Sequence, residues 1–242
     1  MHGQSVKYRP PADAREVLAF EFLGPPTAVE YRYAPQTLFA AGDTELLRAA
    51  RKVAIVGSRE ASPEGLRRAA RLATELVATG VVVVSGLAAG IDRAAHEAAI
   101  RAGGRTIAVI GTPLTKVFPA AHARLQEQIY RDHLLISQFP TGHNTYPSDF
   151  VKRNRTMALL THASVIVEAR DGSGALSQAA ETQRLGRPLF FMKSVLENKA
   201  LDWPERFRVK GARVLESSEQ ILRELPAAVV DSAATTGRIV PG

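Results

Sequence analysis

Small residues and single charges gather at four places along the sequence where a ligand phosphate could be held. Each place follows a short apolar run. They are Gly57-Ser58-Arg59, residues 85–90 with the sequence S-G-L-A-A-G, Gly111-Thr112, and residues 168–174. Small residues let a phosphate approach backbone N–H groups, and a helix beginning there adds a favourable dipole. The four loops together predict a site for a phosphate-bearing ligand. The candidates that they supply are Gly57, Ser58, Arg59, Ser85, Gly86, Gly90, Glu168, Ser173 and Gly174.

A basic cluster, Lys152-Arg153-Asn154-Arg155, opens a later helix that should begin near the same loops. An arginine can hold a phosphate through two hydrogen bonds, and a lysine adds a point charge. We therefore expect all four residues to contribute to the site. The alternative is a solvated basic turn, or an arginine that ties down neighbouring carbonyl groups.

The sequence carries no convincing catalytic constellation. Asp92 and His96 share a helix face, but metal binding needs further ligands and no H-E-x-x-H is present. Neither Ser85 nor Ser173 lies in G-x-S-x-G. Glu168 could bind a sugar hydroxyl, act as a general base or pair with an arginine. The absence of a full G-x-G-x-x-G and of a P-loop motif disfavours a standard NAD enzyme or P-loop ATPase. We expect a binding protein without metal or cofactor.

Composition bounds the protein class. The chain has 242 residues, 31 Lys and Arg against 24 Asp and Glu, and no cysteine, so disulfides and cysteine nucleophiles are excluded. No apolar run reaches the ~20 residues of a membrane helix, and the N-terminus has no signal-like apolar core. The net charge of +7 favours an anionic partner. We expect a cytoplasmic protein without a membrane partner.

Strand-like and helix-like segments alternate through the centre of the chain. Lys52–Val56, Val81–Val84 and Thr106–Ile110 are short β-branched runs typical of buried strands, and 63–79 and 91–102 carry helical apolar periodicity. Repeated βα units predict an α/β fold of the Rossmann-like, doubly wound type, with a mostly parallel sheet and helices on both faces. In such sheets, ligands bind outside the carboxyl ends of the strands, where the four loops should meet.

Three regions are expected along the chain. Residues 1–50 contain two Pro-Pro pairs and are interpreted as an N-terminal extension packed on the core. Residues 51–225 should form the Rossmann-like core. Residues 226–242, which are small and polar, should form a flexible tail.

Several of these segments together resemble one known family. They are V-A-I-V-G-S-R (53–59), V-S-G-L-A-A-G-I-D (84–92), T-I-A-V-I-G (106–111), Phe150 with R-N-R (153–155), V-E-A (167–169), Ser173-Gly174 and Gly186-Arg187. In order and spacing they are similar to the DNA-processing protein A family (DprA, also called Smf) over roughly residues 31–225.

The resemblance implies a Rossmann-like core that binds single-stranded DNA, protects it and helps load RecA during natural transformation or recombination, with no catalytic step. It also implies a homodimer and RecA as a protein partner. The family usually has Glu at Gln138, Pro at Val151, Thr at Gln178 and V-P-G at 192–194. Neither its N-terminal helical domain nor a C-terminal winged helix is expected here. The chain therefore resembles a divergent, core-only member.

Two hypotheses from different classes follow. The first is a single-stranded DNA-binding protein, in which low aromatic content (6%) favours contacts to phosphate over base stacking. The second is a nucleotide-binding sensor or a nucleotide phosphoribohydrolase-like enzyme that uses the same glycine-loop pocket. In that alternative, Glu168 and Arg170 are the acid/base and phosphate-binding candidates, although residues 171–174 lack the P-G-G-x-G-T signature.

Overall fold

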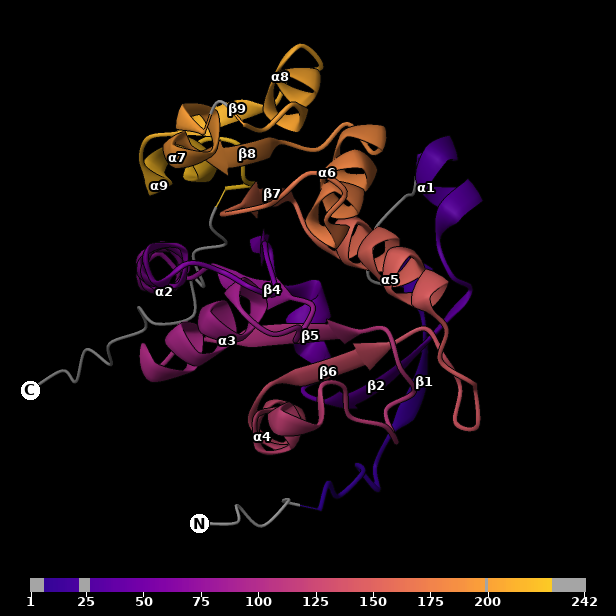
Figure 1. Cartoon of the computed structure of the whole chain (residues 1–242). Helices are drawn as coiled ribbons and strands as arrows, with labels where there is room; N and C mark the ends of the chain where they lie inside the picture. The colour runs from indigo at the N-terminus through magenta and orange to yellow at the C-terminus, as the bar shows by residue number, and fades with distance from the viewer. Residues whose placement is uncertain (1–6, 22–26, 199, 228–242) are drawn as a thin grey trace, which may run out of the picture.

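The computed structural model describes residues 7–21, 27–198 and 200–227, and they build one mixed sheet with helices on both faces (Figure 1). The strand order is β1-β2-β6-β5-β4-β3-β7-β8-β9. The strands are β1 (Arg15–Leu18), β2 (Thr37–Gly42), β3 (Lys52–Val56), β4 (Val82–Ser85), β5 (Thr106–Ile110), β6 (Leu134–Ser137), β7 (Ala163–Ile166), β8 (Leu189–Met192) and β9 (Arg213–Leu215).

The helices complete the α/β arrangement. They are α1 (Ala28–Tyr33), α2 (Pro63–Ala78), α3 (Ile91–Arg101), α4 (Ala123–Asp132), α5 (Pro147–Leu160), α6 (Gly174–Arg184), α7 (Lys193–Glu197), α8 (Trp203–Arg208) and α9 (Ser218–Leu222). Short 3₁₀ turns lie at Ala19–Glu21, Thr44–Arg48 and Ala120–His122.

The sheet is parallel from β6 through β9 in spatial order, and β1 and β2 add an antiparallel edge. Helices α2, α3 and α9 pack on one face through alternate strand residues such as Val53 and Ile55. Helices α5 and α6 pack on the other face, against Ala54 and Val56. The doubly wound, mostly parallel fold expected from the sequence is confirmed.

Local sequence signals explain the best-predicted elements. Helix α2 begins where Ser62 accepts a hydrogen bond from the Gly65 N–H (2.9 Å) and Pro63 takes the first helical position. It ends just before Gly80, whose φ of +75° suits glycine. The expected strand and helix at 52–56 and 63–79 therefore agree with the structure to within one residue.

Helix α5 begins earlier than expected. Residues 143–149 read as a polar loop, but α5 starts at Pro147. The Asp149 carboxylate accepts a hydrogen bond from the Tyr146 N–H (2.9 Å), which caps the helix. A capping aspartate inside a polar run looks like loop sequence, so the true start was missed.

The N-terminal segment forms more of the sheet than its prolines suggested. Within residues 1–50, β1 pairs with β2, and β2 pairs with β6. The division at residue 50 stays a prediction, as does the flexible tail over 226–242, because residues 228–242 lie outside the described part of the chain.

A candidate nucleic-acid binding pocket

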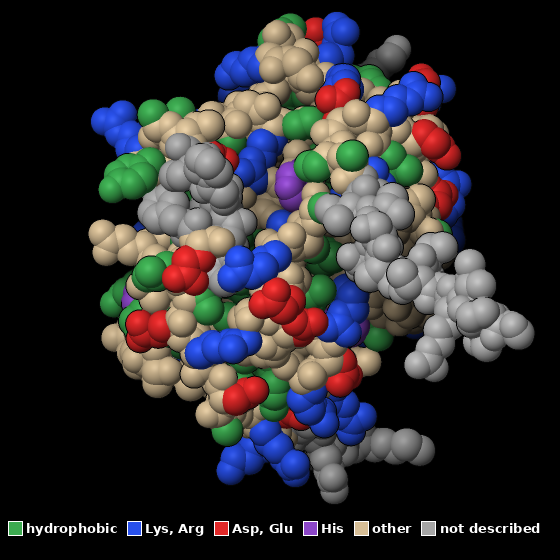
Figure 2. Space-filling view, turned by 180° about the vertical axis from the view of Figure 1, so that it is seen from behind, with side chains coloured by type: hydrophobic (Ala, Val, Ile, Leu, Met, Phe, Trp, Pro, Cys, Tyr) green, Lys and Arg blue, Asp and Glu red, His purple; other side chains and the backbone are tan. Residues whose placement is uncertain are grey.

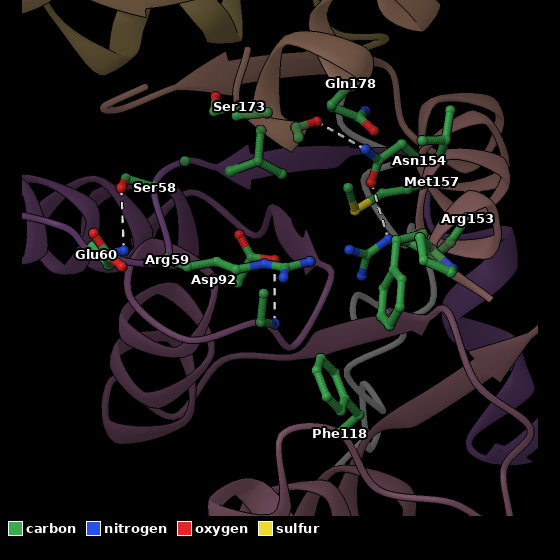
Figure 3. Close-up of a pocket in the computed structure, with 18 of the residues that line it drawn as sticks. Ser58, Arg59, Glu60, Asp92, Phe118, Arg153, Asn154, Met157, Ser173 and Gln178 are labelled. Atoms are coloured by element: carbon green, nitrogen blue, oxygen red, sulfur yellow. Dashed lines mark hydrogen bonds between the residues drawn. The ribbon is translucent and has the colours of Figure 1, made fainter. Parts of the chain in front are cut away.

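A cavity of about 810 Å³ opens where the carboxyl end of β3 meets α5 and the start of α6 (Figure 3). Segments after five strands, β3 to β7, reach it, as expected for an open α/β sheet. Seven predicted residues line it: Gly57, Ser58, Arg59, Arg153, Asn154, Ser173 and Gly174. Gly86 lines a small adjoining cavity of about 120 Å³, which Arg59, Phe118, Phe150 and Arg153 also line.

Three predicted residues support the pocket from outside it. The buried Ser85 hydroxyl donates to the Ile55 carbonyl (2.6 Å). Gly90, with φ +75°, precedes α3, and a Cβ built there would collide with the Ser58 carbonyl oxygen. The Glu168 carboxylate accepts hydrogen bonds from the N–H (3.0 Å) and hydroxyl (2.6 Å) of Ser62 at the start of α2. Glu168 therefore positions a helix.

The outer two residues of the basic cluster are engaged in ion pairs. Lys152 donates to Asp149 (3.1 Å) from an exposed position. Arg155 lies 3.4 Å from the Glu181 carboxylate and stacks over the Tyr33 ring, 4.8 Å from its centroid. The contact with the Tyr33 ring fastens α1 to α5, and the ion pair with Glu181 links Arg155 to α6. Neither residue lines the cavity.

Arg153 is buried in the pocket wall, with 5% of its surface exposed. Its Nη1 donates to the carbonyl oxygens of Gly86 and Val109, and its Nε donates to Asn154 Oδ1 (3.0 Å). Burial lowers its pKa, while the charge of Asp92 acts in the opposite direction. Among the interpretations that the sequence allowed for the cluster, Arg153 matches the arginine that bonds neighbouring carbonyl groups. It forms these bonds at the surface of the cavity.

Asp92 completes this support. Burial raises the pKa of its carboxyl group, and the Arg153 charge opposes that effect. Its Oδ2 accepts hydrogen bonds from the N–H groups of Gly86 (3.1 Å) and Ala88 (3.3 Å). Asp92 and Arg153 together fix the loop between β4 and α3.

Two exposed arginines, Arg59 and Arg170, line the pocket, and Arg59 lies beside its aromatic rings. The Arg59 guanidinium carbon lies 5.5 Å from the centroid of the Phe150 ring, and Phe150 lies 5.4 Å from Phe118. Phe118 is 52% exposed and Tyr146 is 54% exposed. A cation and accessible rings therefore share one pocket, an arrangement able to hold a phosphate and stack a base.

Little in the sequence predicts that these rings come together. Aromatic residues are few, which favoured phosphate contacts alone, but Phe118, Tyr146 and Phe150 all line the same cavity. Phe150 precedes the basic cluster, and that spacing was the available signal. Phe118 lies in an irregular segment between β5 and α4, where no periodicity predicts its place.

Charge on the rest of the surface is mixed. Figure 2 shows Lys and Arg side chains interspersed with Asp and Glu on the face seen from behind. Exposed ion pairs along helices also bring the two signs together, as between Arg93 and Glu97 (2.7 Å) and between Arg71 and Glu75 (3.4 Å). Net charge alone therefore selects no site on this face.

The described residues contain neither a metal-binding group nor a membrane-spanning helix. None of their His, Asp and Glu side chains form a group of three or more that could hold a metal ion. Within the same ranges, every helix is too short or too polar to span a bilayer.

Comparison with known proteins gives one consistent result. The family model for DNA recombination-mediator protein A matches residues 22–226. The DNA processing protein DprA of Streptococcus pneumoniae is 38% identical over 191 residues, covering 79% of this chain and 67% of that protein. Protein Smf of Escherichia coli is 35% identical over 207 residues, covering 85% of this chain but 54% of that protein. The chain thus spans about half to two thirds of these relatives.

Solved structures agree. The crystal structure of DprA from Streptococcus pneumoniae superposes with a TM-score of 0.78 at 33% identity, covering 89% of this chain and 76% of that one. A structure of DprA from Helicobacter pylori, reported for its single-stranded DNA binding mode, gives 0.73 at 27% identity, covering 87% of this chain and 94% of that one.

Proposed function

Because the chain belongs to the DNA recombination-mediator protein A family, we propose that it binds single-stranded DNA in the pocket between β3, α5 and α6. The observation that carries this proposal is the placement of Arg59 over Phe150 beside the exposed Phe118. Proteins that bind single strands combine cations for the backbone with rings on which unpaired bases stack.

The same geometry favours single strands over duplex. A base can stack on a ring that lines a cavity only if it is unpaired and can unstack from its neighbours, whereas the bases of a duplex are paired and stacked. In this proposal, Arg59 holds the adjoining phosphate, and the buried Arg153 fixes the loops of the pocket wall through the Gly86 and Val109 carbonyl groups.

Binding, rather than catalysis, is the activity that we propose. The nucleotide-hydrolase alternative relies on Glu168 as acid or base, but this carboxylate is held by Ser62 at the start of α2. Arg170, its phosphate-binding candidate, lines the cavity and lies 3.3 Å from the Glu60 carboxylate. The arrangement supports a ligand site without a placed general acid or base.

The wider role follows from the family. We propose that the protein protects single-stranded DNA and helps load RecA in transformation or recombination, that it acts as a homodimer, and that it works in the cytoplasm. The similarity to DprA of Streptococcus pneumoniae and the match to the family model support this role.

The proposal is tested by competition. A labelled single strand bound to the protein is titrated with unlabelled single strand, with duplex of the same sequence, or with AMP, and fluorescence anisotropy is recorded. We expect the single strand to displace the label at much lower concentration than the other two. Displacement by AMP at equal or lower concentration, with release of free adenine, would instead support the nucleotide hydrolase.

A further inference from the structure

The side of the pocket at the start of α6 contains polar atoms that phosphate binding does not use. Gln178 and Ser173 line this side, and Thr145 is another lining residue; the atoms in question are Gln178 Oε1, Ser173 Oγ and Thr145 Oγ1. All three atoms are shielded and have no hydrogen-bond partner among the residues that the structure describes. Gln178 is the most enclosed of these residues, with 0% of its surface exposed.

The orientation of the Gln178 amide is fixed by its other end. Its Nε2 donates to Ser164 Oγ (3.1 Å) on β7, and the same oxygen receives a hydrogen bond from Thr182 Oγ1 (2.8 Å). Because the nitrogen is engaged behind the pocket, the amide offers its oxygen on the other side. Figure 3 shows Gln178 next to Asn154, whose own side chain already bonds Gly174 O and Arg153 Nε.

A buried amide oxygen without a partner selects the chemistry of its ligand. It can only accept, so it needs an N–H or O–H donor, and leaving it unpaired in the complex weakens binding. Phosphodiester oxygens are acceptors, and an internal deoxyribose has no hydroxyl group. In a DNA strand, the hydrogen-bond donors of internal nucleotides are therefore the N–H groups of the bases.

The surroundings of Gln178 fit a base. Apolar side chains that line the cavity nearby include Val56, Ala175 and Met157, which are 4%, 8% and 1% exposed. Arg59 follows β3, and the second exposed arginine of the lining, Arg170, follows β7 but lies 3.3 Å from the Glu60 carboxylate in the loop after β3. The cavity thus has a cationic end for the backbone and an apolar end with a polar acceptor, as sites for flat heterocycles commonly do.

We propose that Gln178 is a specificity-determining residue whose Oε1 accepts a hydrogen bond from the N–H edge of one unpaired nucleobase. This inference rests on the proposed function, since it assigns a role within the same pocket. It adds that the protein reads one base by hydrogen bonding in addition to binding the backbone.

The test uses two ligands that differ in one donor. Within a DNA strand, where N1 is bonded to the sugar, thymine has a single N–H, at N3, and N3-methylthymine has none. Homothymidine strands of equal length, with or without N3-methylation, are titrated against the full chain. We expect the wild type to prefer unmethylated thymidine by at least about fivefold, the effect of leaving a buried acceptor unpaired.

Variants separate the hydrogen bond from the bulk of the methyl group. Gln178→Met keeps the length of the side chain and removes the acceptor, so the preference should fall to less than about twofold. Gln178→Leu is the second variant should the first fail to fold. Gln183→Met is the matched control on the same helix, because Gln183 bonds the carbonyl groups of Phe207 and Lys210 away from the cavity. It should keep the full preference.

Each result has one meaning. Equal affinity of the wild type for both strands overturns the inference but leaves DNA binding intact. A preference that persists in Gln178→Met or Gln178→Leu reports the bulk of the methyl group and also overturns it. Failure of the wild type to bind either strand contradicts the proposed function itself.

Discussion

Residues with the same charge serve different purposes in this pocket. Arg59 is exposed over Phe150, Arg153 is buried against two carbonyl groups, and Arg155 fastens α1 through Tyr33. The R-N-R spacing alone could not distinguish these roles, because burial depends on which side of α5 faces the sheet. The sequence assigned all four members of the cluster to the ligand, whereas the structure places Arg153 and Asn154 in the cavity wall and Lys152 and Arg155 outside it.

Phe118 tests the stacking contact. Phe118→Ala should weaken single-stranded DNA binding by about 1–3 kcal/mol, the usual contribution of one stacked base. The free energy of unfolding should change little, because about half of this ring is already exposed. Anisotropy titrations and urea unfolding measure the two quantities.

A control for Phe118→Ala removes an exposed apolar side chain outside the cavity. Val209 is 73% exposed and does not line the cavity, so Val209→Ala should leave DNA affinity unchanged. If Phe118→Ala also binds with wild-type affinity, the ring is no part of the DNA site.

At the level of elements, strands and loops were the predictable part. β-branched runs located β3, β4 and β5, and their carboxyl ends placed the glycine loops at one edge of the sheet. The antiparallel edge formed by β1 and β2 was missed, because T-L-F-A-A-G over Thr37–Gly42 contains small residues and neither alternates regularly nor forms a β-branched run. The sequence predicts a glycine-rich turn over 170–174 and a helix over 175–185, and α6 spans Gly174–Arg184, but the side chains that α6 directs toward the pocket were not predicted.

The turn at Gly90, just before α3, packs closely against the loop that carries Ser58 and Arg59. Gly90 has φ +75°, and an added Cβ would collide with the Ser58 carbonyl. We expect Gly90→Ala to lower the free energy of unfolding by more than the roughly 1–2 kcal/mol typical of left-handed strain alone. It should also weaken DNA binding, since the adjacent Ser58-Arg59 loop must move.

Gly103 provides the matched control at the other end of α3. Its φ is +72°, but a Cβ there meets nothing within 4 Å. Gly103→Ala should therefore show the backbone strain alone and retain wild-type affinity for DNA. Equal losses of stability and affinity in the two variants would contradict the role assigned to Gly90.

At the scale of the whole molecule, buried histidines make stability depend on pH. Burial lowers the pKa of His96 to about 3 and that of His162 to about 4, and it also lowers the pKa of His133. Because unfolded histidine titrates near ~6.5, the unfolded chain takes up protons that the folded chain refuses as pH falls below that value. Burial of Asp92 raises its pKa and acts in the opposite direction.

We therefore expect the free energy of unfolding to be fully retained above about pH 6.5 and to decline as pH falls toward 4. His96 alone contributes a slope of up to about 1.4 kcal/mol per pH unit in this window. Its Nδ1 lies 2.7 Å from Thr106 Oγ1, between α3 and β5. Urea unfolding of wild type and His96→Gln across the window should show a shallower slope in the variant. An unchanged slope would exclude His96 as a contributor.

The central claim is that single-stranded DNA binds through Arg59 in this pocket, and salt dependence tests it most directly. Anisotropy titrations of a labelled single strand are made at several salt concentrations with wild type, Arg59→Ala and Arg101→Ala. Arg101 is an exposed arginine at the end of α3, 3.9 Å from Glu97, and does not line the cavity.

Each phosphate neutralised contributes about −0.7 to the slope of log K against log salt. We expect Arg59→Ala to bind more weakly, with a slope shallower by about 0.7. Arg101→Ala should be indistinguishable from wild type in both affinity and slope. Wild-type affinity and slope in Arg59→Ala, or equal losses in both variants, would contradict the central claim.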